Sequence, residues 1–566
     1  MKKESIMKIY QEKIDFIIIG LTGLTGSGCT TTANLLKQPL DEWNLKPEEE
    51  TLRTTDSRKN QIIFEYANKN KEYYQFEVIE VKNIIMSFIL ENDYKNFLKY
   101  VRDFSLLDKF KFSSNFEQLY SEMHLKRVGF KEKVDKSLKN YDESILISDE
   151  LYNFYFHEIN KVTDLLKEEL DAIQTKLYTK LFQTIGRNIR LSGDILSDEL
   201  HSDCVYNLSQ RINMLIKILR KRNIVNKKGV RVVIDALRNP LEISFFKDRY
   251  SAFYVFSINA ENDERKKRLS AKGFLDENIE DIEKSENKEK IVDKEQFAAQ
   301  NIPRCLQLAD VHLTNHDMVE KDETEFISLK RNLLMYITLI MQPGLITPTH
   351  VERCMNIAFN AKLNSGCISR QVGALVTDKN YSVVSIGWNS VPEGQTPCNL
   401  RNIDDLVNCA NKEDFSEFER SNESFKKYVK TKKINKICLE GRNHSYCFKD
   451  YYMDLKSEKN QVHTRSLHAE ENAFLQISKY GGRAVFSGIL FTTASPCELC
   501  AKKAYQLGIN TIYYIDPYPG ISKEHILSAG INSPNMKLYY GAIGNAFTKL
   551  YNPIMSMKDE LALFDE

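Results

Sequence analysis

The sequence has no strong charge of either sign, no membrane-length apolar run and no internal repeat. Its 79 Lys and Arg nearly balance 78 Asp and Glu, so the formal net charge is +1. This balance argues against a protein that binds long nucleic acids, although a local basic groove stays open. The longest apolar run near the start, Phe16–Gly20, is too short to span a bilayer and leads into a glycine loop rather than a cleavage site. We expect a cytoplasmic protein without a membrane partner.

Cysteines are present, but in a number that argues against a disulfide framework. The chain has 11 of them, an odd count, and they are unevenly spaced. In a chain with 42% hydrophobic and 28% charged residues, an ordinary globular composition, this favours metal ligation or buried thiols. A length of 566 residues exceeds what one hydrophobic core supports, so we expect about two to four domains.

A glycine-rich loop near the start matches a phosphate-binding pattern except that it lacks one lysine. Residues Gly23–Thr32 read GLTGSGCTTT, and Cys29 stands at the lysine position of the P-loop pattern G-x-x-x-x-G-K-[ST]. Backbone N–H groups and a helix dipole hold phosphate without that lysine, whereas phosphoryl transfer needs the charge. We therefore predict that the loop binds a nucleotide, with Mg²⁺ as its companion ion, but does not transfer phosphate. The predicted contacts are Gly23, Gly26, Ser27, Gly28, Cys29, Thr30 and Thr31.

The first part of the chain alternates strand-like and helical patterns, which predicts an α/β fold with a doubly wound parallel sheet. Strands are expected at Phe16–Gly20, Val230–Ala236 and Phe253–Ile258, and residues 145–222 are mainly helical in pattern. The Glu- and Lys-rich stretch Asp276–Glu295 predicts a solvated helix or a mobile lid.

A domain boundary is predicted at Gln342–Thr349, which holds two prolines and a glycine. We expect a nucleotide-binding domain at 11–341, a second domain at 347–540 and a separate C-terminal segment at 541–566. The polar stretch 392–465 reads as an insertion on one rim of the second domain. The elements expected before it are a helix at His350–Lys362 and strands at Gln371–Thr377 and Val383–Trp388.

The strongest pattern lies in the second domain, where His468 and Glu470 precede Pro496, Cys497 and Cys500. This is the H-x-E…P-C-x-x-C signature of zinc deaminases. One imidazole and two thiolates leave a tetrahedral zinc with an open position for water, whose pKa falls from 15.7 to about 7. Glu470 is not a ligand, and we expect it to carry the proton of that water to the pyrimidine N3 and the leaving ammonia. A closed structural site would need a fourth protein ligand that the pattern does not supply.

The run from Val351 to about 515 resembles the deoxycytidylate deaminase family. The likeness lies in CISRQVGALV at Cys367–Val376, IGWNSVPEG at Ile386–Gly394 and the HAEEN and SPCELC segments. It implies a cytidine-deaminase-like α/β/α domain. In that family the Asn of the G-x-N segment binds the sugar and the Arg before Q-V-G approaches phosphate, which implies these roles for Asn389 and Arg370.

The whole layout is similar to the bacterial anti-phage dCTP deaminases, in which a P-loop kinase-like domain precedes a deoxycytidylate deaminase domain. Two C-terminal stretches resemble that subfamily, Tyr513–Leu527 and Gly541–Leu561. The resemblance implies conversion of dCTP and dCMP to deoxyuridine nucleotides, which starves phage DNA of cytosine. Ala469 and Tyr518 complete the predicted substrate contacts. For Tyr518 and Tyr514, a role in the hydrophobic core is an equally supported alternative.

The first half resembles the deoxynucleoside monophosphate kinase and dephospho-CoA kinase group, through LFQTIGRNIRLSGD at Leu181–Asp194. The likeness implies a Walker-B-like acid at Asp235 and lid-like cations at Arg265 and Arg268. We expect a regulatory pocket in which dTTP or dCTP reports the state of the nucleotide pool to the deaminase. Two alternatives stay open: a loop kept only for packing, and a live kinase in which Arg238 or a lid arginine replaces the lost charge.

A second, structural zinc occurs in some relatives in the deaminase superfamily. Unliganded thiols are the favoured alternative here, because the flanking residues match no tight motif. The residues that could hold such a zinc are Cys367, Cys398, Cys438, His444, Cys447 and His463.

Two other functions stay open. A bifunctional enzyme of thymidylate supply, both kinase and dCMP deaminase, would need phosphoryl transfer at the glycine loop. Cys29 at the lysine position argues against that transfer. A polynucleotide deaminase acting on tRNA or single-stranded DNA would need a basic track with stacking aromatics, and Lys426–Lys436 (KKYVKTKKINK) is the only candidate. A solvated loop explains this segment more simply, and a contact with a regulatory non-coding RNA is a third interpretation. The deaminase resemblance further implies a symmetric homo-oligomer.

Overall fold

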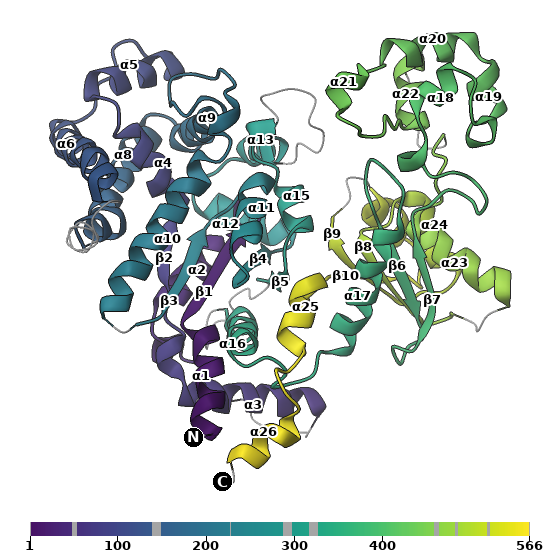
Figure 1. The fold of residues 1–566 in the computed structure, drawn as a ribbon, viewed down its shortest axis with the longest axis horizontal. Helices are drawn as coiled ribbons and strands as arrows, with labels where there is room; N and C mark the ends of the chain where they lie inside the picture. Colours follow the sequence, from purple (N-terminus) through teal and green to yellow (C-terminus); the bar gives the residue numbers. More distant parts are fainter. Residues whose placement is uncertain are drawn as a thin grey trace. The chain divides into compact units, whose positions relative to one another are not determined.

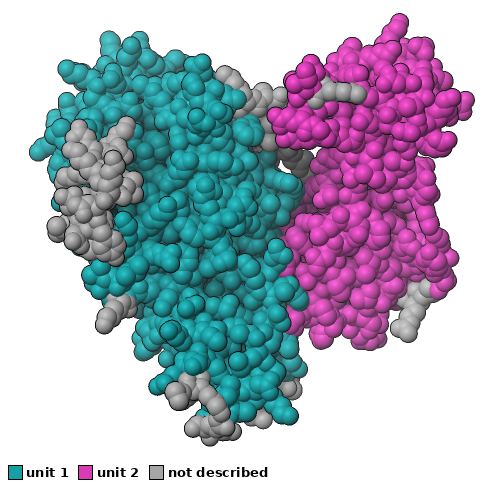
Figure 2. Space-filling model, in the orientation of Figure 1, with its two compact units in different colours: residues 1–347, 545–566 teal, residues 348–544 magenta. Residues whose placement is uncertain are grey.

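The computed structural model describes residues 2–47, 54–137, 149–226, 228–286, 297–315, 326–457, 463–481, 485–517 and 521–564. It divides into two compact units, coloured separately in Figure 2. Unit 1 comprises Met1–Thr347 and Asn545–Glu566, and unit 2 comprises Pro348–Gly544. The predicted C-terminal segment 541–566 is thus divided between the units, because its last helices pack on unit 1. Both units are mixed α/β folds (Figure 1).

The sheet of unit 1 is parallel and its central strand leads into the glycine loop. Its strands are β1 (Phe16–Thr22), β2 (Glu77–Glu80), β3 (Val230–Asp235), β4 (Phe253–Asn259) and β5 (Val311–Thr314). Their order is β5-β4-β1-β3-β2, and each of these neighbouring pairs is parallel. β1 and β4 are buried over nearly their whole length, which is typical of strands covered on both faces.

Helices cover both faces of this sheet. Ile18, Ile234 and Val255 point into one large core that the helices between β2 and β3 complete. On the other face Phe256 of β4 contacts Tyr336 edge-on, with ring centroids 6.3 Å apart. Among the described residues, no helix combines the length and apolar character needed to cross a bilayer. The helices are α1 (Lys2–Ile14), α2 (Cys29–Lys37), α3 (Thr55–Lys69), α4 (Val81–Ile89), α5 (Tyr94–Ser105), α6 (Ser114–Ser137), α8 (Ile159–Ile173), α9 (Leu177–Ser192), α10 (Asn207–Val225), α11 (Pro240–Arg249), α12 (Asn262–Ala271), α13 (Asp276–Glu286), α15 (Ile302–Gln307), α16 (Ile327–Met341), α25 (Gly544–Tyr551) and α26 (Met557–Phe564).

α13 differs from the solvated helix predicted for Asp276–Glu295. Ile279, Ile282 and Glu286 are buried. Their spacing of three and four residues places them on one face of the helix, which packs inward. The rest of that stretch, 287–295, lies outside the described residues.

The sheet of unit 2 mixes parallel and antiparallel pairs and lies between two helix layers (Figure 1). The order is β10-β9-β8-β6-β7, with β8, β9 and β10 parallel and β6 antiparallel to β7 and β8. The strands of this sheet are β6 (Gly373–Thr377), β7 (Val383–Trp388), β8 (Ile489–Ala494), β9 (Thr511–Asp516) and β10 (Asn535–Leu538). The short strand β11 (Gly541–Ala542) is not part of it.

Successive residues of β6 point to opposite faces of this sheet. Ala374 and Val376 pack with α23 (Ala469–Tyr480) and α24 (Glu498–Gln506), whereas Leu375 packs with α17 (His350–Ala361). α17 begins with a capping box between Thr349 and Glu352. This alternation gives an α/β/α arrangement.

The described residues of the insertion, 392–465, fold as a small helical cluster with a core of its own. Its core contains Ile403, Phe415, Phe425 and Tyr446, among others. Arg401 and Glu419 form a fully buried ion pair inside the insertion. Its helices are α18 (Ile403–Val407), α19 (Glu417–Ser421), α20 (Glu423–Thr431), α21 (Lys436–Leu439) and α22 (Phe448–Lys456). The polar composition of the stretch concealed this core, because few apolar residues suffice for a cluster of this size.

Candidate metal centre and active site

The three predicted metal ligands meet at the starts of two helices. His468 is the N-cap of α23 and Cys497 is the N-cap of α24, with Cys500 in the first turn. Nδ1 of His468 lies 3.3 Å from Sγ of Cys497 and 3.5 Å from Sγ of Cys500. Across the described part of the chain, this is the one group of three such side chains whose ligand atoms all lie within 4.8 Å of one another. One imidazole and two sulfurs at this spacing fit zinc.

The backbone of β7 allows α23 to begin at this point. A Cβ on Gly387 would lie 2.3 Å from the carbonyl oxygen of Ala469 and 2.4 Å from the backbone nitrogen of Ala473. Glycine therefore lets the first turn of α23 lie directly against the strand. This close contact fixes His468 and Glu470 at the edge of the sheet.

The donor atoms already influence one another electrostatically. The hydrogen bond from the Cys500 thiol, followed by the one with His468, lowers the pKa of Cys497. The hydrogen bond to Cys497 in turn raises the pKa of His468. A cation at this point stabilises both sulfurs as thiolates, which is the form that binds metal.

Glu470 lies beside these donors and is 4% exposed. Its Oε1 accepts a hydrogen bond of 2.9 Å from Oγ1 of Thr492 on β8, which fixes the orientation of the carboxylate. Burial raises the pKa of Glu470, so the carboxyl holds a proton more readily than an exposed one. The neighbouring Glu471 is instead ion-paired with Lys503.

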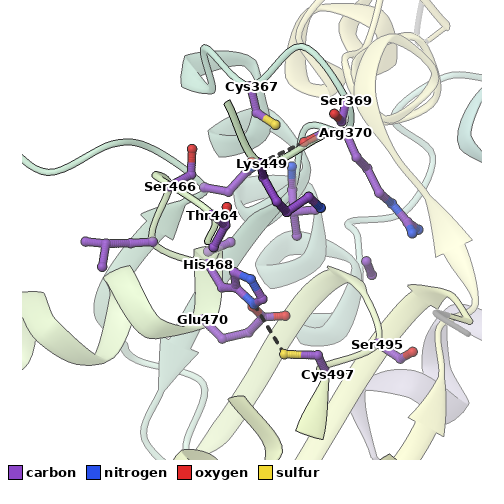
Figure 3. A pocket seen from close by; sticks show the side chains of 15 residues that line it. Cys367, Ser369, Arg370, Lys449, Thr464, Ser466, His468, Glu470, Ser495 and Cys497 are labelled. Carbon is purple, nitrogen blue, oxygen red and sulfur yellow. Dashed lines mark hydrogen bonds between the residues drawn. The ribbon is translucent and has the colours of Figure 1, made fainter. Parts of the chain in front are cut away.

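These residues line one pocket, shown in Figure 3. In this view, Glu470 and Cys497 lie below His468, and Lys449 and Thr464 lie above it. The lining residues are Cys367, Ser369, Arg370, Val372, Asn389, Lys449, Thr464, Ser466, Leu467, His468, Ala469, Glu470, Ala494, Ser495 and Cys497. Lys449, Thr464 and Ser466 were not predicted from the sequence, because the insertion carries the first two and no motif marks the third.

Three of the predicted substrate contacts, Arg370, Asn389 and Ala469, line this pocket. The amide of Asn389 is bound to the adjoining loop: its Oδ1 accepts from the Val372 N–H at 2.7 Å, and its Nδ2 donates to the Arg370 carbonyl at 2.8 Å. Arg370 is ion-paired with Asp516. Tyr514 lies in β9 and is not among the lining residues.

Tyr518, the fourth predicted contact, lies outside the described residues. Within the described residues there is also no cluster for a second zinc. Among the six described residues proposed for it, no three bring their ligand atoms together. They are Cys367, Cys398, Cys438, His444, Cys447 and His463.

The glycine loop of unit 1 lies between β1 and α2, where a parallel sheet binds ligands. Gly26 and Gly28 have φ of 87° and 110°, a region that favours glycine. At the end of the neighbouring β3, Asp235 is hydrogen-bonded to Thr30, and burial raises the pKa of Asp235. Gly23, Ser27 and Cys29 are buried, whereas Thr31 is half-buried and Thr30 is exposed.

Cys29 leaves the loop without the charge of a lysine. Burial raises the pKa of its thiol to about 12, so the side chain is neutral at physiological pH. Arg265 and Arg268 of α12 do not extend as a lid. Nε of Arg265 donates to the Thr25 carbonyl at 3.2 Å, and the Arg268 guanidinium donates to the Asn315 carbonyl at 2.8 Å.

A carboxylate of the chain itself is hydrogen-bonded to the glycine loop. Glu286 of α13 accepts a hydrogen bond of 3.0 Å from the Thr25 backbone N–H, and another from the Thr25 hydroxyl. Its other contact is an ion pair with Arg238, and its side chain is fully buried. Glu286 was not predicted from the sequence, although its spacing from Ile279 and Ile282 places it on their helix face.

The site combines one His and two Cys donors of the kind that zinc binds with a buried glutamate beside them, an arrangement typical of zinc-dependent deaminases. Residues 348–516 match the family described as the cytidine and deoxycytidylate deaminase zinc-binding region. The deoxycytidylate deaminase of Enterobacteria phage T2 is 27% identical over 168 residues, which cover 29% of this chain and 78% of that protein. Residues 348–516, within unit 2, are therefore similar to cytidine and deoxycytidylate deaminase domains.

A bacterial and a cyanophage protein are also similar to this chain. ComE operon protein 2 of Bacillus subtilis is 44% identical over 76 residues, 13% of this chain and 40% of that protein. A solved structure of dCMP deaminase from the cyanophage S-TIM5, in complex with dCMP and dUMP, is 20% identical and covers 34% of this chain and 99% of that one. Its TM-score is 0.21, and at that value the likeness supports no further conclusion.

Proposed function

We propose that unit 2 hydrolyses the exocyclic amine of deoxycytidine nucleotides, dCTP and dCMP, to give dUTP or dUMP and ammonia. The supporting observation is the buried carboxylate of Glu470 beside three zinc-type donors in one pocket. The relatives named deoxycytidylate deaminases favour a deoxynucleotide substrate. In the reaction a C4–O bond forms and the C4–N bond breaks. The two protons of water go to N3 and to the leaving amine.

The residues of the pocket divide this work. His468, Cys497 and Cys500 would hold zinc, which supplies a water of lowered pKa. Glu470 takes a proton as a base and returns it as an acid, and its raised pKa suits a group that must do both. Thr492 holds the carboxylate in place for each transfer.

The direct test incubates the purified full chain with dCTP, dCMP, CTP and single-stranded DNA in parallel. We expect deoxyuridine products from the two deoxynucleotides and none from Glu470→Ala. Deamination confined to DNA would overturn the proposal in favour of a polynucleotide editor. The Lys-rich segment gives such an editor little support, because several of its lysines are ion-paired within the insertion. These are Lys426 with Glu423, Lys432 with Asp454 and Lys433 with Asp404.

For unit 1 we propose a regulatory nucleotide pocket of P-loop type rather than a working kinase. The position of the loop between β1 and α2 supports the pocket, and Asp235 with Thr30 would hold Mg²⁺. The neutral side chain of Cys29 supports the proposal that the loop does not transfer phosphate. Arg238, the suggested replacement for the lysine, is itself ion-paired with Glu286. The bifunctional alternative predicts ADP formation with dCMP or dTMP as acceptor, and we expect none.

Glu286 gives this proposal a specific test. Its carboxylate occupies a backbone N–H that a phosphate oxygen would need. We expect Glu286→Gln to bind dTTP or dCTP at least tenfold more tightly in equilibrium dialysis, because the competing charge is gone. Glu280→Gln, on an exposed position of the same helix, serves as the control. Equal, weak binding by all forms would contradict a nucleotide pocket.

At the level of the cell, we propose that depletion of cytosine deoxynucleotides protects against phage, with the chain acting as a homo-oligomer. The support is the resemblance in overall layout. Cells expressing the protein should lose dCTP on infection and restrict phage plating, whereas Glu470→Ala cells should do neither. Light scattering on the purified chain measures the number of subunits.

A further inference from the structure

The pocket around Glu470 contains a positive charge that the deamination step does not use. Lys449 lines this pocket, although it belongs to the insertion and not to the deaminase motif. We propose that Lys449 binds the phosphate groups of the nucleotide, so that the insertion sets the preference for phosphorylated substrates. This inference rests on the deamination proposed above.

Exposure of the lining side chains increases from Glu470, where the reaction is proposed, toward the open end of the pocket. Glu470 is 4% exposed, whereas the side chains of Arg370 and Lys449 are 22% and 28% exposed. Lys449 and Thr464 lie on the other side of His468 from Glu470 in Figure 3. A cytosine whose amine reaches Glu470 therefore directs its sugar and phosphates toward the cations.

The two cations differ in what already binds them. Arg370 is ion-paired with Asp516, whose side chain is 4% exposed, so a buried carboxylate offsets its charge. Nζ of Lys449 lies 3.9 Å from Oδ1 of Asp450, at the limit of an ion pair, and the Asp450 side chain is 35% exposed. Pairs that are this long and this open to solvent are weak. The ammonium of Lys449 is consequently available to an incoming phosphate.

The surroundings of Lys449 also suit an anion. Ser369, Thr464 and Ser466 line the same pocket, and their hydroxyl groups are donors for phosphate oxygens. Lys449 is the second residue of α22, so the positive end of the helix dipole adds to its charge. Glu470 is the one carboxylate among the lining residues, and it lies at the buried end.

The core of the insertion fixes the position of this lysine. Phe448, Tyr451 and Tyr452 of α22 pack against the buried cluster of the insertion. Lys449 is therefore held by an element that is separate from the zinc ligands. Substitutions of Lys449 should change phosphate recognition and leave the chemical step intact.

The test compares kinetics on deoxycytidine, dCMP and dCTP for the wild-type full chain and Lys449→Gln. We expect KM for dCTP and dCMP to rise at least tenfold, as one charge-assisted contact is lost, with kcat within twofold. The kcat/KM for deoxycytidine should not change. Lys449→Arg should restore most of the affinity, and the difference from Lys449→Gln should shrink as salt is added.

Lys456→Gln is the matched control, because it removes one charge from the exposed far end of the same helix. An equal loss on all three substrates, or no loss on the phosphorylated ones, would overturn the role of Lys449. Absence of deamination in the wild-type chain would instead contradict the proposed function, so the two failures are distinguishable.

Discussion

At the scale of single residues, Glu470 allows the proposed chemistry to be tested separately from metal binding. It lies beside His468, Cys497 and Cys500 but is not one of the three donors. We expect Glu470→Gln to lower kcat for dCMP by roughly 10²–10⁴-fold, since the proton carrier is lost. Zinc content, measured by elemental analysis, should not change.

Glu393 is the control for this substitution, because it is an exposed glutamate that is ion-paired with Lys479 and does not line the pocket. Glu393→Gln should retain the wild-type rate. If Glu470→Gln loses its zinc, Glu470 takes part in holding the metal, and the assignment of roles is wrong.

The thiol of Cys29 gives a second prediction at this scale. Burial raises its pKa to about 12, so at pH 8 only a very small fraction is thiolate, the reactive form. Exposed Cys409 and Cys438 should react with iodoacetamide at pH 8 in the folded protein, while Cys29 should not. Mass spectrometry of the digested protein measures this. Rapid alkylation of Cys29 would show that the loop carries a charged thiolate instead of a neutral side chain.

At the scale of elements, the insertion depends on one buried ion pair. Arg401 and Glu419 are fully buried, and Tyr446 hydrogen-bonds to both, at 2.7 Å and 2.6 Å. Removing one partner leaves an unpaired buried charge, so Glu419→Gln should destabilise the insertion by about 3–5 kcal/mol. Hydrogen exchange across 398–452 measures this loss, and exchange in α17 should not change. Protection equal to that of wild type would contradict the importance of the pair.

The same pair predicts a pH dependence. Burial alone would raise the pKa of Glu419, but Arg401, Tyr446 and the Ser416 N–H together lower it. The folded pKa is thus below the unfolded value of about 4.3. The pair therefore stabilises the insertion above about pH 4.3, and this contribution is lost as the pH falls through the folded pKa. Protection of the insertion should decline below pH 4 in wild type and change less in Glu419→Gln.

At the scale of the whole molecule, the chain leaves unit 1 at Thr347 and returns to it at Asn545. Within unit 1, the Tyr10 hydroxyl donates to Glu560 at 3.0 Å and Nζ of Lys549 donates to the Ser251 carbonyl at 2.7 Å. The C-terminal helices therefore complete unit 1, although they follow the deaminase domain in sequence.

This connectivity predicts two separable effects on thermal unfolding. A chelator should lower the melting temperature of unit 2 only, because ligands of a bound metal stabilise the domain that holds them. Truncation after Gly544 should destabilise unit 1 and leave the zinc site occupied. Calorimetry with zinc analysis distinguishes the effects. A chelator that lowers both transitions equally would show that the units unfold together.

Much of the site could be predicted because its information is local. His468 and Glu470 are two residues apart, Cys497 and Cys500 three apart, and each pair begins a helix. Such spacing alone aims side chains at a common point. The first and last residues of β1 and α17 were likewise near their predicted positions, since glycines and caps act over a few residues.

The sequence by itself thus determined which residues are candidates for zinc donors, for proton transfer and for a phosphate-binding loop. Only the tertiary structure decided which other side chains lie against these residues. Glu286 reaches Thr25 across 261 residues, and Lys449 enters the pocket from an insertion with its own core. Their positions follow from how whole elements bury their apolar faces. Burial of this kind sums many non-directional contacts over distant residues, so no short pattern encodes it.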